Sequence, residues 1–139
     1  MTSDDSTVFP ADEWRSLLHA LCRDDVSGIG PSTPGEPLSY IAPTRYSWLK
    51  AMRWRPVRTS FGIALLELTE PGKHPAHDWE PICGPLVLGP VIPGTPGATY
   101  QGILTLPDTG RRAAVYLTTT DPAHNLAGRV TTVQVRIEP

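Results

Sequence analysis

The chain lacks any apolar run that approaches the roughly 20 residues of a transmembrane helix, so we expect no membrane-spanning segment. Its first residues are acidic and polar and do not have the pattern of a signal peptide. Cysteine is scarce, with only Cys22 and Cys83 among 139 residues. These features predict a cytoplasmic protein whose two thiols are reduced rather than joined in a disulfide.

The sequence also has no GxGxxG, Walker, GxSxG or CxxC motif. This removes the usual motif-based case for a nucleotide-binding, hydrolase or thiol-redox function, and we predict no cofactor. Lysine is nearly absent, with two residues against ten arginines, a ratio that suggests a GC-rich bacterial genome. The formal net charge of −2 argues against a general nucleic-acid-binding protein.

Positive charge is gathered in one segment, residues 45–58, which holds five of the 12 basic residues and no acid. Tyr46, Trp48 and Trp54 alternate with these cations. Residues 1–44 have a net charge of −5 and residues 59–139 one of −2. The arginines could pair with the acidic N-terminal region, or bind a phosphate-bearing ligand, an acidic protein or nucleic acid.

One helix is predicted near the N-terminus, from about Pro10 to about Asp25. Proline suits a first helical position, and the acids that follow it favour the positive end of the helix dipole. Apolar residues then recur with helical spacing along a single stripe. The stripe consists of Trp14, Leu17, Leu18, Leu21 and Cys22.

Most of the remaining chain is predicted as strands. Residues 57–69, 98–106, 111–120 and 129–138 alternate in polarity with a period of two, and a turn at 107–110 joins two of them. The last three should form an antiparallel meander. Residues 44–52 fit either a helix or a strand, and we predict a helix because Pro56 blocks a long continuous strand.

Residues 71–97 form a long loop with seven prolines and five glycines. Loops of this length are commonly lids or binding loops. The alternative is a pair of short edge strands that pack on the sheet. The resulting fold class is α+β, a single domain over residues 1–139 with residues 1–8 disordered. By architectural analogy we expect one or two N-terminal helices on a mostly antiparallel curved sheet, as in a cystatin-like or NTF2-like roll.

The loop also holds the main cluster of reactive groups: His74, His77, Asp78, Glu80 and Cys83. Their spacing matches no established metal motif, and we predict no metal. A histidine beside a carboxylate can exchange protons near neutral pH, so His77 and Asp78 are the candidate catalytic residues. His19 and His124 are further candidates for this chemistry.

The leading functional hypothesis is a pocket between helix and sheet that binds a small organic ligand under the 71–97 loop. Isomerase, cyclase or dehydratase chemistry could accompany binding. The candidate ligand-binding residues are Trp54, Arg55, Trp79 and Tyr100. The alternative is a non-enzymatic interaction module that uses residues 45–58 against an acidic partner. The sequence does not determine the oligomeric state.

Overall fold

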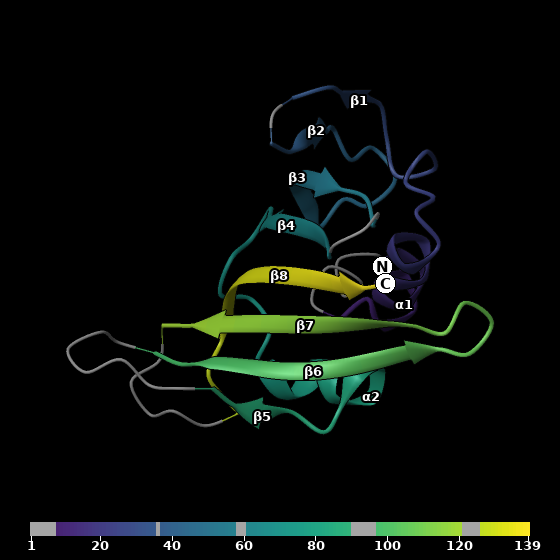
Figure 1. Ribbon diagram of the computed structural model, residues 1–139. Helices are drawn as coiled ribbons and strands as arrows, with labels where there is room; N and C mark the ends of the chain where they lie inside the picture. Colours follow the sequence, from purple (N-terminus) through teal and green to yellow (C-terminus); the bar gives the residue numbers. More distant parts are fainter. Residues whose placement is uncertain (1–7, 36, 58–60, 90–96, 121–125) are drawn as a thin grey trace.

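A computed structural model describes residues 8–35, 37–57, 61–89, 97–120 and 126–139 (Figure 1). It contains a long helix, two short helical turns and one sheet of eight strands. The helical elements are α1 (Ala11–Cys22), the 3-10 helix η2 (Ala76–Trp79) and α2 (Glu80–Cys83). The strands are β1 (Ser32–Thr33), β2 (Ser39–Ile41), β3 (Leu49–Arg55), β4 (Gly62–Leu68), β5 (Val87–Leu88), β6 (Thr99–Leu106), β7 (Arg111–Thr119) and β8 (Val130–Glu138).

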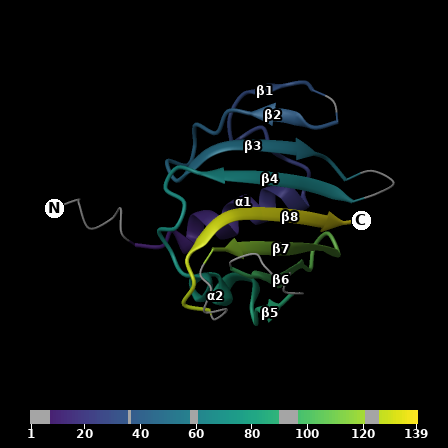
Figure 2. The same cartoon turned by 90° about the vertical axis from the view of Figure 1, so that its left-hand side faces the viewer.

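All neighbouring strands are antiparallel, in the order β1-β2-β3-β4-β8-β7-β6-β5. Figures 1 and 2 show this order from edge to edge, with β1 and β5 at the two ends. The α+β class is therefore confirmed, as is the predicted meander of β6, β7 and β8. Gly110 closes the β6–β7 hairpin with a φ of 71°, a conformation that favours glycine. None of the described helices is long and apolar enough to cross a membrane.

The predicted helix over residues 44–52 is wrong, because this part of the chain enters strand β3. Leu49, Met52 and Trp54 are buried on one face, while Arg53 is exposed on the other. A register shift between Leu49 and Ala51 lets this irregular spacing fit one strand. The strand ends just before Pro56, so the proline limits its length without preventing it.

Strand β4 turns Gly62, Ala64 and Leu66 toward the core. Ala64 is fully buried, whereas Phe61, just before the strand, and Leu65 are 40% and 37% exposed. Ala64 lies directly opposite Trp54 of β3, so a small residue and a large one fill the same layer. The alternation predicted for residues 57–69 is present within β4, but Phe61, Ile63 and Leu65 lie on the face turned away from the core.

The predicted stripe of α1 is confirmed, since each of its five residues is at most 2% exposed. The stripe packs with the buried residues of the sheet in one core. The helix begins at Ala11, one residue after Pro10, and its last turn ends at Cys22 rather than at Asp25. Burial of this stripe places α1 on one side of the sheet and leaves the opposite face uncovered by any described element.

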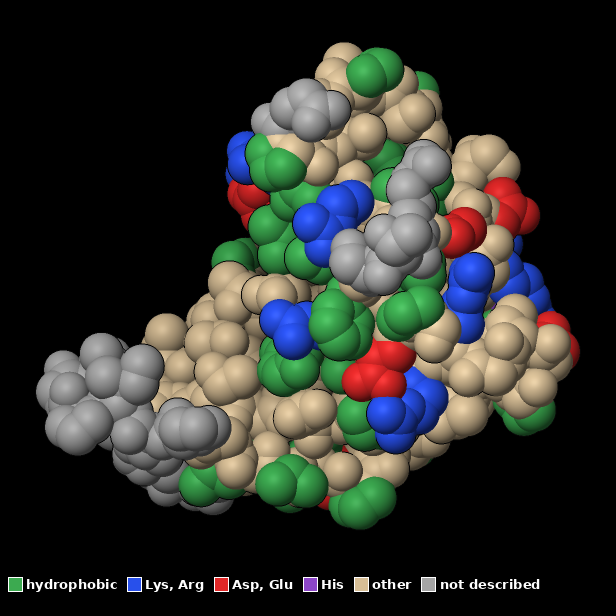
Figure 3. Space-filling view, viewed as in Figure 1, with side chains coloured by type: hydrophobic (Ala, Val, Ile, Leu, Met, Phe, Trp, Pro, Cys, Tyr) green, Lys and Arg blue, Asp and Glu red, His purple; other side chains and the backbone are tan. Residues whose placement is uncertain are grey.

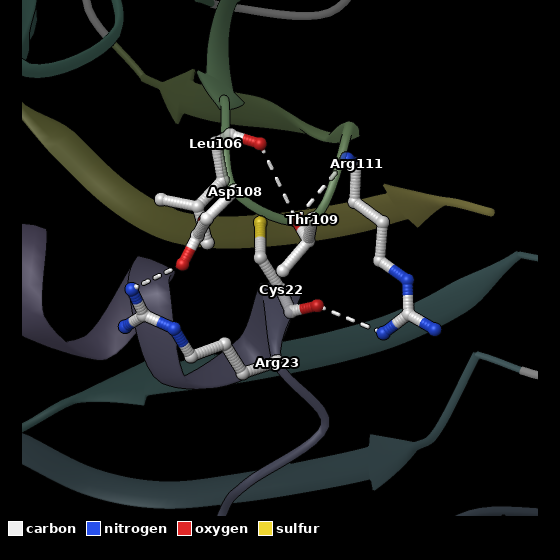
Figure 4. Close-up of polar contacts among 6 residues, drawn as sticks. All are labelled: Cys22, Arg23, Leu106, Asp108, Thr109 and Arg111. Atoms are coloured by element: carbon white, nitrogen blue, oxygen red, sulfur yellow. Dashed lines mark hydrogen bonds and ion pairs between the residues drawn. The ribbon is translucent and has the colours of Figure 1, made fainter.

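Polar contacts fix the end of α1 against the β6–β7 hairpin (Figure 4). Arg111 donates a hydrogen bond of 2.8 Å to the carbonyl oxygen of Cys22 and lies 3.3 Å from Asp24. Arg23 pairs with Asp108 in the hairpin turn at 3.0 Å. A cation at the C-terminus of a helix also compensates the negative end of its dipole. These contacts hold the orientation of α1 across the sheet.

The described part of the 71–97 segment packs against the rest of the fold instead of forming an irregular loop. Backbone hydrogen bonds join Gly72, Ala76 and His77 to residues 126–130. The helical turns η2 and α2 then bury four side chains, and β5 adds an edge strand. This arrangement resembles the packed alternative considered for the segment. Val91 and Ile92, two apolar residues of the predicted lid, lie outside the described residues.

Candidate functional site: an aromatic cleft beside the first turn of α1

The clearest cleft lies where the first turn of α1 meets the loop before β3, the end of β4 and the segment around residue 74. Its volume is about 190 Å³. Because the stripe of α1 fills the middle of the helix–sheet layer, this cleft lies at the rim of that layer. It is lined by Val8, Pro10, Glu13, Trp14, Ser47, Trp48, Leu68, Glu70, Lys73, His74 and Trp79. We call it the aromatic cleft.

Three of the four tryptophans of the chain line the aromatic cleft and contact one another. Trp14 stacks on Trp48 with ring centroids 4.3 Å apart and meets Trp79 edge-on at 5.4 Å. Phe9 packs edge-on against Trp79 at 4.6 Å. Tyr46, outside the cleft, stacks on Trp48 with ring centroids 5.1 Å apart. Such contacts make the walls rigid, because each ring restricts the rotamers of the next.

The polar groups of the cleft are fixed by neighbours. The indole nitrogen of Trp48 donates a hydrogen bond of 2.7 Å to Glu13, which links the loop before β3 to α1. Lys73 donates to Glu70 at 2.8 Å. Arg129 donates to the backbone oxygen of Lys73 at 2.7 Å and so holds this segment to the start of β8. The cleft therefore presents aromatic surface together with carboxylates whose positions are set.

His74 is the titratable ring of the cleft, and Asp78 lies behind it. Its Nδ1 atom is 3.6 Å from a carboxylate oxygen of Asp78, and the Nδ1 atom of His77 is 3.4 Å from the other oxygen. The ring of His74 also packs edge-on against Phe9 at 5.4 Å. Burial lowers the pKa of His74, and Lys73 and Arg129 add to this effect, while Asp78 and Glu70 oppose it.

Acidification is expected to destabilise the protein through His74. Because its pKa in the folded chain lies below the ordinary 6.5, the unfolded chain binds more protons between these two values. The stabilising contribution is thus complete above 6.5 and is lost as the pH falls through the lower pKa. Urea midpoints measured between about pH 7 and about pH 5 should fall, and His74→Gln should reduce the fall.

His77→Gln serves as the matched control for this titration, because the His77 side chain is 52% exposed against 17% for His74. We expect the control to follow the unmodified chain. If both variants keep the full pH dependence, its source is another group and the assignment to His74 is contradicted.

The predicted site residues do not meet in one place. Trp79 lines the aromatic cleft, and Asp78 lies behind its histidine. His77, the predicted catalytic base, is half-exposed and is not among the lining residues of the cleft. Tyr100 is buried in β6 outside this cleft. The catalytic roles predicted for His77 and Asp78 stay predictions.

The two predicted ligand-binding residues of β3 lie on opposite sides of the sheet. Trp54 is buried, 4% exposed, and borders a separate shallow depression near Asp24 and Pro56. Arg55 points away from α1, and its guanidinium donates 2.8 Å to the backbone oxygen of Phe61. Neither side chain is placed at the aromatic cleft, and their roles in ligand binding stay predictions.

Sequence reasoning missed several residues that the fold brings into the cleft, namely Glu13, Trp14, Ser47, Trp48, Leu68, Glu70 and Lys73. Trp14 belongs to the core stripe of α1, and Trp48 to the basic segment, so no pattern joined them. No signal in the sequence pointed to these residues as neighbours, because they come from several separate segments of the chain.

Metal and thiol chemistry find little support at the predicted cluster. Within the part of the chain that the structure describes, no three His, Cys, Asp or Glu side chains gather as a possible metal site. The absence of a bound metal stays a prediction. Burial raises the pKa of the Cys83 thiol to about 11, with Glu80 adding to the effect, so this thiol is protonated at neutral pH. His124 lies outside the described residues.

Comparison of the chain with protein-family models, with curated proteins and with solved structures finds no match. The functional argument consequently depends on the geometry of the chain alone.

Proposed function

We propose that this protein binds a small organic ligand in the aromatic cleft. The observation that carries the proposal is the convergence of Trp14, Trp48 and Trp79 on one concave site that also holds His74 and Glu13. Ligand sites typically combine apolar and aromatic walls with a few fixed polar groups. The volume of 190 Å³ is below the roughly 300–1,000 Å³ of sites for drug-sized molecules, which favours a ligand of about one ring.

The proposal includes acid–base chemistry at His74. A neutral histidine near an oriented carboxylate can accept a proton from a bound molecule and return it. The lowered pKa of His74 keeps the ring neutral near pH 7, and Asp78 lies on its Nδ1 side, so its Nε2 atom would be the one that exchanges a proton with the ligand. Isomerisation, cyclisation or dehydration all need such a group. In this proposal the part of the 71–97 segment around residue 74 forms a fixed wall of the cleft and does not act as a lid.

The cystatin-like or NTF2-like roll remains an architectural proposal. In such a roll a ligand would lie between the helix and the sheet. Here the proposed site is displaced to one end of that layer, beside the first turn of α1, because the stripe of α1 occupies the centre.

Indole N–H signals in an NMR spectrum test the proposal directly. We suggest titrating the protein with benzoate, benzylamine and phenol, three single-ring probes of different charge. The expected result is that at least one probe shifts the signals of Trp14, Trp48 and Trp79 but leaves that of Trp54, which lies outside the cleft, unchanged. Ser47→Phe, at an exposed lining position, should fill the cleft and weaken binding about tenfold or more, a change of about 1.4 kcal/mol.

Ser27→Phe is the matched control, because Ser27 is also exposed but lies away from the cleft. It should bind the probes as the unmodified chain does. Shifts confined to Trp54, or no indole shift with any probe at millimolar concentration, would reject the cleft as the binding site.

A further inference from the structure

We propose that the sheet face opposite α1 docks an acidic segment of a partner protein, which presents carboxylate and apolar side chains to this face. We call this the outer face. It is independent of the aromatic cleft, since it lies on the other side of the sheet. The proposal rests on three observations: arginines without an acidic partner among the described residues, exposed apolar side chains beside them, and a shallow hollow on this face.

The register of the strands brings residues distant in sequence into rows on the outer face. Arg53 of β3 lies opposite Leu65 of β4, which lies opposite Gln134 of β8 and then Tyr116 of β7. The next row runs through Arg55, Ile63, Arg136, Ala114 and Ile103. Adjacent strands are about 4.8 Å apart, so Arg55 and Arg136, two strands apart, are about 10 Å apart along their row.

Arg53, Arg55 and Arg136 have no acidic partner among the described residues. Six other basic residues pair with carboxylates, namely Arg15, Arg23, Lys50, Lys73, Arg111 and Arg112. The Nε atoms of Arg55 and Arg136 are buried and lack an acceptor within the described chain. For residues 45–58, pairing with the acidic N-terminal region was one of the alternatives, and among the described residues it is not seen for Arg53 or Arg55, because β3 turns both away from α1.

Exposed apolar side chains surround these three arginines. Phe61, Leu65 and Ile103 are 40%, 37% and 38% exposed. Figure 3, which views this face, shows hydrophobic and basic side chains side by side over the middle strands. Beside them lies a shallow hollow of about 450 Å³, bordered by Leu65, Tyr116, Gln134 and Arg136 among others. Arginine and aromatic residues together are typical of protein interfaces.

The charge of the outer face favours an acidic partner. Among the described residues, the acids directed to this face, Glu67 and Glu138, are already paired with Lys50 and Arg112. The three remaining guanidinium groups therefore make the face positive on a chain whose net charge is −2. A carboxylate that arrives at this face gains charge-assisted hydrogen bonds without displacing an internal ion pair.

An acidic protein segment fits this face better than single-stranded nucleic acid does. Bases bind by stacking on open aromatic rings. Here the guanidinium of Arg136 lies over the rings of Phe61 and Tyr116, 5.1 and 6.0 Å from their centroids, and so covers part of both. Leu65, Ile63 and Ile103 offer aliphatic surface, which suits apolar side chains of a peptide. Along the second row arginine and aliphatic residues alternate as Arg55, Ile63 and Arg136. An extended peptide turns every second side chain to the same side, so acidic and apolar residues two positions apart match this alternation.

The test uses the full chain and a fluorescein-labelled peptide of Glu-Ser-Leu-Ser repeats, whose glutamate and leucine side chains share one side when the peptide is extended. We expect saturable binding in fluorescence anisotropy that weakens as salt is raised, because long-range attraction is screened. Replacing Arg53 and Arg136 together with glutamine should weaken binding at least about tenfold and reduce its salt dependence. A peptide with lysine in place of glutamate should not bind.

The matched control replaces Arg15 and Arg23 with glutamine, which removes the same charge from residues of the α1 side. It should bind the peptide as the unmodified chain does, with thermal melts confirming that both double variants are folded. Equal weakening in both variants, or no binding by the glutamate peptide, overturns the proposal. Two other results would assign the face to another occupant. One is tighter binding of a dT oligonucleotide, and the other is self-association in sedimentation that the outer-face variant abolishes.

Discussion

Replacing Trp79 with alanine is expected to lower the free energy of unfolding by about 3–5 kcal/mol, as for other large aromatic residues in protein cores. Trp79 is 1% exposed at the junction of η2 and α2, and it contacts Phe9 and Trp14. Its loss leaves a cavity that the hydrogen-bonded sheet cannot collapse to fill. Urea unfolding should be followed by far-UV circular dichroism, because the substitution also removes a fluorophore.

Trp79→Phe separates ring volume from hydrogen bonding. The indole nitrogen of Trp79 is buried and has no acceptor among the described residues. Phenylalanine keeps much of the apolar contact and removes this unsatisfied donor, whose burial costs about 1–3 kcal/mol. We therefore expect a much smaller loss than for alanine. Equal losses in the two variants would show that the indole nitrogen has a partner that matters more than the ring contacts.

Leu18→Ala is expected to cost about 2–5 kcal/mol, because this residue is fully buried in the centre of the α1 stripe. Arg15→Ala on the same helix is the matched control. Arg15 pairs with fully exposed Asp12, and exposed pairs contribute only about 0–1 kcal/mol. Urea unfolding measures both. A loss below about 0.5 kcal/mol for Leu18→Ala, the level of a surface change, would contradict the packing of α1 on the sheet.

The two proposed binding surfaces can be tested separately because they lie on opposite sides of the sheet. The aromatic cleft uses residues of α1 and of the segment around residue 74, whereas the outer face uses outward residues of β3, β4, β7 and β8. The substitutions suggested for Arg53 and Arg136 alter no lining residue of the cleft. Loss of peptide binding with unchanged probe binding is the pattern expected of two independent sites.

Local patterns in the sequence predicted the elements that are buried on one side and exposed on the other. The stripe of α1 and the alternation in β6, β7 and β8 are of this kind, because an element buried on one side repeats its apolar residues with its own period. Residues 44–52 failed this test. Trp48, Leu49 and Met52 fit a helix and Met52 and Trp54 fit a strand, and only the register shift in β3 resolves the ambiguity.

The site could be predicted only in part for a related reason. The sequence drew attention to the cluster from His74 to Cys83, which lies close together along the chain. It could not show that His74 rather than His77 would line the same cleft as Trp14 and Trp48, because these residues come from three separate segments. Contacts between distant segments depend on the hydrogen bonds that join residues 72–77 to 126–130. They also depend on the hydrogen bond from Arg111 to the carbonyl oxygen of Cys22 at the end of α1.

The sequence by itself determined the α+β class, the buried face of α1 and the C-terminal meander, because composition and period are properties of each segment alone. The tertiary structure decided which face of β4 is buried, where the tryptophans converge and which arginines lack an acid partner within the described chain. Those outcomes depend on strand order and register, and a shift of one residue in register exchanges every inward side chain for an outward one. Arg53 and Arg55 are separated from the acidic helix for this reason: pairing with β4 turned them outward.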